Sequence, residues 1–295
     1  MSTVMAAYDH LIECFVAWAE AQPDIRAALI LGSRTRVDHP ADEWSDLDLL
    51  FFTTDPRRYV ANTDWLRNLG LYWLIFFEPE VSGDTMECSV LFDGALDVDF
   101  VLIPVEALRN LLRDGLTPDV MAAISRGFRI IVDKDGFSDA FKSLSLPPIT
   151  HELPSEGAFL NVVNDFWYRC VWTAKKLRRG ETWTARGGLD RYMAWHCLLP
   201  MIEWHARATK GQECDTWHGG RFLEQWADAR ALEGLRTACS HYDGADIRRG
   251  MVATMELFRW LAKETAERLG YPYPVSGDEH VTEWVRTCLS EIGTT

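Results

Sequence analysis

Residues 27–52, AALILGSRTRVDHPADEWSDLDLLFF, carry the most informative pattern of the N-terminal half. It contains two short apolar runs, Ala27–Leu31 and Leu47–Phe52, whose length and composition are typical of buried strands. The first run ends at Gly32-Ser33, and the second begins inside the triplet Asp46-Leu47-Asp48. The pattern therefore predicts two strands whose adjoining loop carries a glycine, a hydroxyl and two carboxylates.

The two carboxylates, Asp46 and Asp48, are two residues apart, so on a strand their side chains leave the same face. Two carboxylates on one face repel each other unless a cation lies between them. Mg²⁺ is commonly held by one or two carboxylates together with substrate phosphates. Gly32 permits a close approach of the backbone to a ligand, and Ser33 offers a hydroxyl. These features predict a loop that cradles a triphosphate beside a magnesium site.

The overall composition indicates a globular enzyme. The chain has 295 residues, which suggests two domains, and 47% of them are hydrophobic. Its seven cysteines form no CxxC pair, which favours reduced thiols in a cytoplasm. A net charge of −14 argues against a nucleic-acid partner and suits a small cationic substrate. We find neither a signal-peptide pattern nor a membrane span and expect a cytoplasmic protein.

The periodicity of the chain divides it into two regions. In the first, we expect a helix over 4–21, a short helix over 62–69, a helix over 105–113 and a strand over 129–132. A hairpin is expected between Glu87–Phe92 and Ala95–Ile103, with Asp93-Gly94 as a two-residue type I′ turn. A proline-rich linker over 146–154 precedes the second region, where the 3.6-residue period predicts helices over 156–179, 189–209, 219–240, 245–269 and 278–291.

We therefore expect an N-terminal α/β (α+β) domain with a mixed sheet over residues 1–147. An all-helical domain is expected over residues 148–295. The second arm of the hairpin again places acids at a period of two, and Asp97 and Asp99 are both candidates for a third carboxylate. That residue would complete the metal site or accept the proton of an attacking hydroxyl.

A wider pattern resembles a known family. The segments ALILGSRTR, DEWSDLDLLFF, LDVDFVLIPVEAL, LDRYMAWHCLLPMIEW and ERLGYPYP are similar to those of the aminoglycoside 6-adenylyltransferases. This streptomycin-modifying family belongs to the polymerase-β-type nucleotidyltransferase superfamily. The resemblance covers the chain from Ile25 to about Pro274.

The resemblance implies an activity: transfer of AMP from Mg-ATP to a hydroxyl of an aminoglycoside, the 6-hydroxyl of streptomycin, with release of pyrophosphate and resistance to the antibiotic. It also implies roles for individual residues. Gly32, Ser33 and Arg34 would lie at the ATP phosphates, and Asp46 and Asp48 would bind Mg²⁺. Asp99, five residues before Pro104, matches the third carboxylate of the family.

The acceptor is expected to bind the helical domain. The guanidinium groups of streptomycin suit carboxylates and the faces of tryptophan rings. The candidates are Asp165, Trp167, Trp172, Asp190 and Glu203. Lys175, in a basic run, is a candidate for the ATP phosphates, although cations at a helix end also have a purely structural role.

Two other functions fit the same pattern. One is a non-catalytic, antitoxin-like binding protein on the nucleotidyltransferase fold, against which the intact set of carboxylates argues. The other is an adenylyltransferase whose acceptor is another aminoglycoside, a lincosamide or a metabolite.

Overall fold

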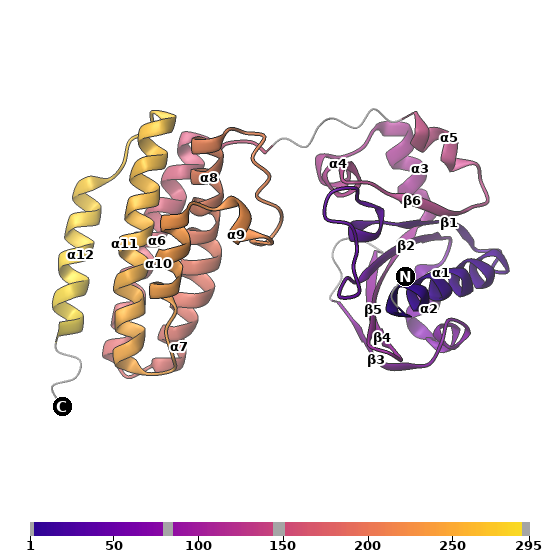
Figure 1. Cartoon of the computed structure of the whole chain (residues 1–295), viewed down its shortest axis with the longest axis horizontal. Coiled ribbons are helices and arrows are strands. Elements are labelled where there is room, and N and C mark those ends of the chain that lie inside the picture. The colour runs from indigo at the N-terminus through magenta and orange to yellow at the C-terminus, as the bar shows by residue number, and fades with distance from the viewer. Residues whose placement is uncertain (1–2, 79–84, 144–150, 291–295) are drawn as a thin grey trace. The chain divides into compact units, whose positions relative to one another are not determined.

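The computed structural model describes residues 3–78, 85–143 and 151–290 (Figure 1). The chain divides into two compact units, Met1–Ile149 and Thr150–Thr295, and each is described by itself. Most of the expected linker over 146–154 lies outside the described residues.

The N-terminal unit contains one mixed sheet of six strands in the order β3-β4-β5-β2-β1-β6. Strands β2 and β5 are parallel, and the other neighbouring pairs are antiparallel, so the predicted mixed sheet is confirmed. The strands are β1 (Ile25–Ile30), β2 (Leu47–Thr53), β3 (Tyr72–Phe77), β4 (Met86–Phe92), β5 (Leu96–Pro104) and β6 (Arg129–Asp133). The helices are α1 (Thr3–Glu20), α2 (Pro56–Ala61), α3 (Val105–Asp114), α4 (Pro118–Ser125) and α5 (Phe137–Lys142), with 3₁₀ turns η1 (Gly32–Thr35) and η2 (Asp64–Asn68).

Helices cover both faces of this sheet, and the alternation along β2 shows how. Leu47, Leu49 and Phe51 belong to a large apolar cluster that includes α1, as two successive side chains of a strand point to opposite faces. On the other face, Phe52 packs with Val105 and Leu108 of α3, and Leu50 lies against the same cluster. Asp48 shares that second face but lies nearer the beginning of the strand, outside the cluster.

Two details of the N-terminal prediction are corrected. The helix expected over 62–69 is only the 3₁₀ turn η2, preceded by the separate helix α2. The predicted two-residue turn at Asp93-Gly94 is wrong, because Phe92 pairs with Leu96 and leaves three residues in the loop. The positive φ angles fall at Gly94 and Ala95, whereas a type I′ turn at Asp93-Gly94 would need one at Asp93.

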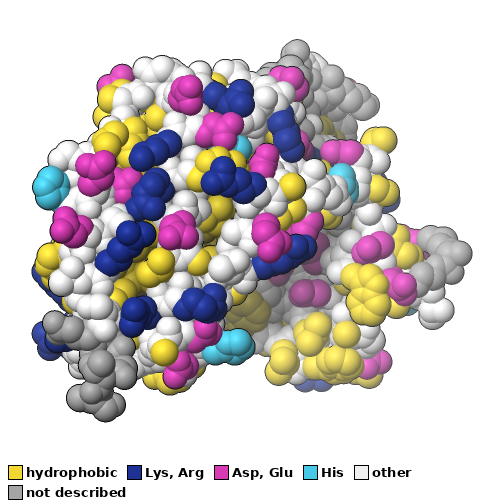
Figure 2. All heavy atoms as spheres, turned by 60° about the vertical axis from the view of Figure 1, so that its left-hand side comes forward, with side chains coloured by type: hydrophobic (Ala, Val, Ile, Leu, Met, Phe, Trp, Pro, Cys, Tyr) yellow, Lys and Arg dark blue, Asp and Glu magenta, His cyan; other side chains and the backbone are white. Residues whose placement is uncertain are grey.

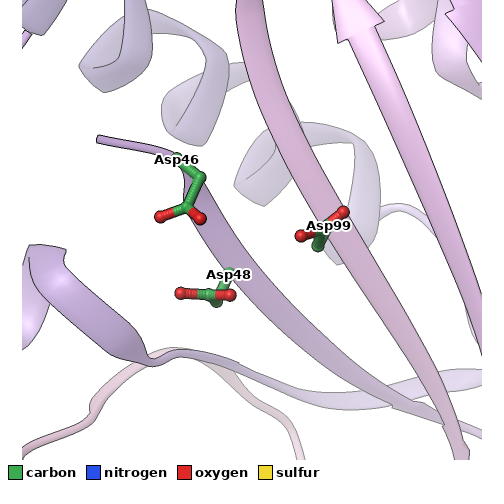
Figure 3. A group of neighbouring side chains, drawn as sticks. All are labelled: Asp46, Asp48 and Asp99. Atoms are coloured by element: carbon green, nitrogen blue, oxygen red, sulfur yellow. The ribbon is translucent and has the colours of Figure 1, made fainter. Parts of the chain in front are cut away.

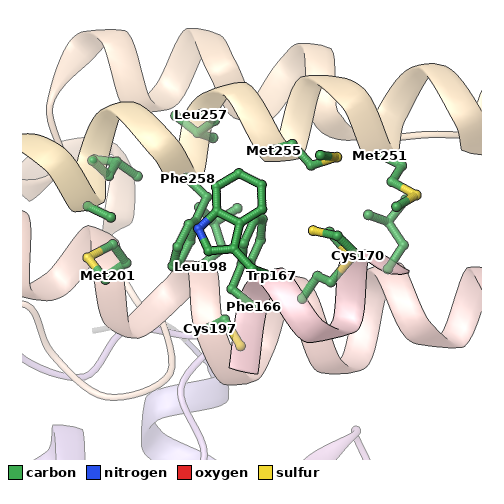
Figure 4. Packing of buried hydrophobic residues seen from close by; sticks show 14 of the residues in the cluster. Phe166, Trp167, Cys170, Cys197, Leu198, Met201, Met251, Met255, Leu257 and Phe258 are labelled. Carbon is green, nitrogen blue, oxygen red and sulfur yellow. The ribbon is translucent and has the colours of Figure 1, made fainter. Parts of the chain in front are cut away.

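The described part of the C-terminal unit is helical, as predicted. Its elements are α6 (Glu156–Arg178), α7 (Thr182–Gly187), the π-helical segment η3 (Gly188–Leu198), α8 (Leu199–Lys210), α9 (Leu223–Trp226), α10 (Ala229–Ala238), α11 (Gly244–Leu269) and α12 (Val275–Ser290). Figure 4 shows part of the core between these helices, where the rings of Phe166 and Phe258 stack with centroids 3.7 Å apart. Basic and acidic side chains alternate over the face shown in Figure 2.

Two helices of this unit differ from the prediction. A single helix over 219–240 is wrong, because Gly219, Gly220 and Phe222 have positive φ angles and delay its start. Asp228 then caps a new helix, α10, by accepting a hydrogen bond from the backbone N–H of Arg230 at 2.7 Å. The helix expected over 189–209 begins earlier and runs through α7, η3 and α8, with a change of hydrogen-bond pattern in the middle.

Candidate active site

Three aspartates come together at the beginning of β2 and in the first half of β5. Asp46 immediately precedes β2, Asp48 is its second residue, and Asp99 lies directly opposite Asp48 in the parallel ladder. One carboxylate oxygen from each residue lies within 4.8 Å of the other two. Figure 3 shows the three side chains gathered on one side of the two strands. The group is half-buried, so its charges are partly removed from water and still accessible.

Gly32, the first residue of η1 after β1, closes one side of this group. Its φ angle is +70°, and a Cβ at this position would lie 1.9 Å from Oδ2 of Asp48. The backbone is held close by a hydrogen bond from the N–H of Leu31 to the carbonyl of Asp48, 3.0 Å long. Glycine is therefore required for two reasons, the backbone angle and the space taken by the carboxylate.

Next to it, the hydroxyl of Ser33 is buried and has no hydrogen-bond partner in the structure. A buried polar group without a partner is rare in proteins and calls for an explanation such as a ligand. Oxygen donors from three carboxylates are the ligand set that Mg²⁺ prefers. The residues present therefore fit a metal ion with a phosphate group beside it.

Arg34 supports the loop that carries Asp46. Its guanidinium donates to the backbone carbonyls of Ser45 and Asp46, both at 2.9 Å. It also lies 3.6 Å above the ring of Tyr8 in α1, and the hydroxyl of Tyr8 accepts a hydrogen bond from the backbone N–H of Asp97 at 2.9 Å. This network connects the beginnings of β2 and β5, which carry the three aspartates.

Asp97, the other candidate for the third carboxylate, lies outside the group of three. Burial and the neighbouring carboxylates of Asp99 and Asp46 raise its pKa. The pKa of Glu87 in β4 is raised by burial and by Asp99 and Glu78. This concentration of negative charge stabilises any cation bound to this face of the sheet.

In the C-terminal unit, two of the residues predicted to bind the acceptor substrate, Asp165 and Trp172, lie two turns apart on the same side of α6. Asp165 accepts a hydrogen bond from Nε of Arg169 at 3.1 Å, and the guanidinium of Arg169 lies 4.6 Å from the ring centre of Tyr192 in η3. The ring of Trp172 meets the same Tyr192 edge-on, with centroids 6.3 Å apart. Asp165 and Trp172 thus belong to one polar and aromatic surface between α6 and η3.

The other candidates lie elsewhere in this unit. Trp167 is only 4% exposed and packs in the core, so its ring offers no face to an acceptor. Asp190 forms an ion pair with Arg186. Glu203 lies 3.7 Å from Arg207, and burial raises its pKa despite that cation. Lys175 lies 5.6 Å from the ring centre of Trp284 in α12.

The structure also shows two residues at the site that sequence reasoning missed, Tyr8 and Ser89. Ser89 of β4 is opposite Asp99 in the antiparallel ladder and donates a hydrogen bond to it. The correct length of the hairpin loop would have placed Ser89 there from the sequence. For Tyr8 we find no sequence signal beyond its position on the buried face of α1.

A mixed sheet with a glycine-serine turn and a half-buried triad of aspartates is the arrangement expected of an enzyme of the nucleotidyltransferase type. Sequence comparison identifies the family within this class. The profile of the streptomycin adenylyltransferase family matches residues 5–288, and the chain belongs to this family.

Two relatives extend over nearly the full chain. The aminoglycoside 6-adenylyltransferase of Bacillus subtilis strain 168 is 25% identical over 95% of this chain and 97% of its own. That of Campylobacter jejuni is 24% identical over 95% of each chain. The crystal structure of an aminoglycoside 6-adenyltransferase from Bacillus subtilis covers 94% of this chain and 97% of its own, with 20% identity and a TM-score of 0.43. Within the described residues, no helix has the length and apolar character of a membrane span.

Proposed function

We propose that this protein transfers AMP from Mg-ATP to a hydroxyl of an aminoglycoside and releases pyrophosphate. The 6-hydroxyl of streptomycin is the proposed acceptor, in line with the names of the relatives. The observation that carries this proposal is the triad of Asp46, Asp48 and Asp99 beside the unpartnered hydroxyl of Ser33. A purely binding, antitoxin-like protein has no need of such a triad.

In this proposal each residue of the site has a task. Asp46, Asp48 and Asp99 hold Mg²⁺, which when bound neutralises phosphate charge and favours in-line attack. Gly32 lets the phosphates approach the backbone, and Ser33 donates its hydroxyl to a phosphate oxygen. Arg34 keeps Asp46 in place through the two backbone carbonyls. Asp99 is also the proposed acceptor of the proton that the attacking hydroxyl loses.

The acceptor is proposed to be a cation. Besides the triad, the same face of the sheet carries Asp97 and Glu87, whose pKa values are raised by burial and, to a lesser extent, by neighbouring carboxylates. Asp165 and Trp172 of the helical unit are proposed to contact the guanidinium groups of streptomycin, through charge-assisted hydrogen bonds and ring contact. The N-terminal unit is then the nucleotide-binding part, and the helical unit the acceptor-binding part.

The test is release of pyrophosphate from Mg-ATP with streptomycin, a second aminoglycoside and a lincosamide as acceptors. We expect release that depends on streptomycin and falls at least about 10²-fold in Asp46→Asn and Asp48→Asn. Asp97→Asn, on the same face but outside the triad, is the matched control and should lower pyrophosphate release only slightly. Release with none of the acceptors, from a protein that binds Mg-ATP, would contradict the proposed activity.

Asp99→Asn separates the two tasks given to this residue. Loss of the proton acceptor alone leaves Mg-ATP affinity within a few-fold of wild type while turnover falls by roughly 10²-fold. Loss of a metal ligand lowers turnover, ATP affinity and apparent Mg²⁺ affinity together. Because we assign both tasks to Asp99, we expect the second result.

A further inference from the structure

Ser89 is a buried hydroxyl directed at the triad. It lies in the middle of β4, is 8% exposed, and is paired with Asp99 across the antiparallel ladder. Its Oγ donates a hydrogen bond of 2.5 Å to Oδ1 of Asp99. Directly opposite side chains in such a pair lie on the same face of the sheet, so β4 contributes this group to the face that carries the carboxylates.

A hydrogen bond at this place has a specific consequence. The last torsion of an aspartate side chain is broad, so the backbone and the rotamer do not fix the plane of its carboxylate. The charges of Asp46 and Asp48 repel Asp99 and favour rotation away from them. A donor on Oδ1 holds the plane of the carboxylate and leaves Oδ2 for a metal ion. A hydrogen bond to a carboxylate is also among the stronger kinds in proteins.

We propose that Ser89 is a positioning residue for the transfer reaction, which holds the carboxylate of Asp99 in the orientation of the third metal ligand. This inference rests on the proposed function for its kinetic part. Its metal-binding part depends only on the triad.

The test compares Ser89→Ala with wild type in two measurements. The first is Mn²⁺ binding to the nucleotide-free protein, followed by electron paramagnetic resonance, where we expect an affinity three- to tenfold weaker. The second is steady-state transfer at saturating Mg-ATP, where we expect kcat to fall about tenfold or more and KM for the acceptor to stay within twofold. Ser89→Thr keeps the hydroxyl and should restore both values to within about threefold of wild type.

Ser138→Ala is the matched control. Ser138 also donates its hydroxyl to an aspartate, Asp133, but at the beginning of α5 and outside the triad. Both alanine variants lose one serine–aspartate hydrogen bond, and only Ser89→Ala should change Mn²⁺ affinity. Ser89→Cys, with a somewhat larger side chain and a weaker donor, should fall between wild type and Ser89→Ala.

The inference is overturned if Ser89→Ala binds Mn²⁺ within twofold of wild type, or if its loss of kcat is not restored by threonine. Failure of the proposed function would look different, because wild type would then transfer AMP to none of the acceptors. The Mn²⁺ measurement would still decide the role of Ser89 in that case.

Discussion

A single missing side chain, that of Gly32, leaves the space in which Asp48 lies. In Gly32→Ala the new Cβ would lie 1.9 Å from Oδ2 of Asp48, at a φ angle of +70°. We expect a loss of about 1–2 kcal/mol of stability from the backbone angle, together with displacement of the carboxylate. Mn²⁺ binding and turnover should therefore fall at least tenfold, as measured by titration and by pyrophosphate release.

Gly94→Ala is the control for Gly32→Ala. Gly94 has a similar φ angle of +80°, but a Cβ there would meet no atom within 4 Å. It should lose a similar amount of stability in urea unfolding and keep the metal affinity of wild type. Equal Mn²⁺ affinities in the two variants would show that the space near Asp48 is unimportant.

A second residue, Asp278 of α12, is expected to make the stability of the helical unit depend on pH. Its side chain is 2% exposed, and its carboxylate accepts hydrogen bonds from Arg259, Tyr273 and Thr282. Burial alone would raise the pKa of Asp278, but the hydrogen bonds from Arg259 and Tyr273 hold it below its usual value. Its stabilising contribution is therefore fully present above the unfolded pKa of about 4 and is lost as the pH falls through the folded pKa.

We expect Asp278→Asn to lower the free energy of unfolding of the helical unit by about 3 kcal/mol at pH 7, because Arg259 loses its buried partner. In urea unfolding, the difference from wild type should be constant from pH 7 to pH 5 and shrink below about pH 4. Glu279→Gln, at an exposed position of the same helix, should stay within about 0.5 kcal/mol. A difference that does not change between pH 7 and pH 3 would contradict the assignment.

At the scale of elements, two adjacent glycines where α7 meets η3 should respond in opposite directions to the same substitution. A Cβ on Gly188 would lie 2.6 Å from Oγ1 of Thr173 and 2.8 Å from the ring of Trp172, both on α6. We expect Gly188→Ala to lose about 1–3 kcal/mol of stability through overpacking. A Cβ on Gly187 would meet nothing within 4 Å, so Gly187→Ala should gain up to about 1 kcal/mol. Thermal unfolding measures the stability of both variants. Higher stability in both than in wild type would exclude close packing of η3 on α6.

The hairpin of β4 and β5 shows how far the sequence could predict the site. The two strands and the Asp-Gly turn signal were readable from local pattern, as were Asp46 and Asp48. The pattern left Asp97 and Asp99 both open as the third carboxylate, and only the family resemblance favoured Asp99. The loop is one residue longer than the predicted type I′ turn, and this one residue changes the register. With the shorter loop, Cys88 would stand opposite Asp99, and Ser89 would stand opposite Val98. Turn length depends on the packing of both strands, which a local pattern does not contain.

The segment η3 shows a similar limit. The period of 3.6 residues predicted a helix over 189–209, and a helix is there. A π-helical segment shifts the side chains around the axis, and so it decides which of them meet α6. In the structure Trp172 meets Tyr192 of η3, and Asp190 pairs with Arg186, four residues earlier. Such segments are often found at functional sites, in agreement with the proposed acceptor surface.

At the scale of the whole molecule, the two units have separate hydrophobic cores. The clusters of the N-terminal unit draw on residues between Tyr8 and Phe141, and the cluster of the C-terminal unit on residues between Phe159 and Leu289. We expect a fragment ending at Ile149 to fold, to bind Mn²⁺ within tenfold of the full chain and to show no calorimetric binding of streptomycin. Streptomycin binding by the fragment with the affinity of the full chain would contradict the assignment of the acceptor to the helical unit.

The order of the strands in the sheet differs from their order along the chain, which has a consequence during synthesis. Asp46 and Asp48 leave the ribosome long before Asp99, and β1 gains its second neighbour, β6, only when Arg129–Asp133 has followed. Until then the nascent chain has an apolar strand with an open edge, the feature that invites pairing with other chains. Chains that stall or end between Asp99 and Arg129 should therefore be prone to aggregation and rapid proteolysis, even though they already contain every residue of the carboxylate triad.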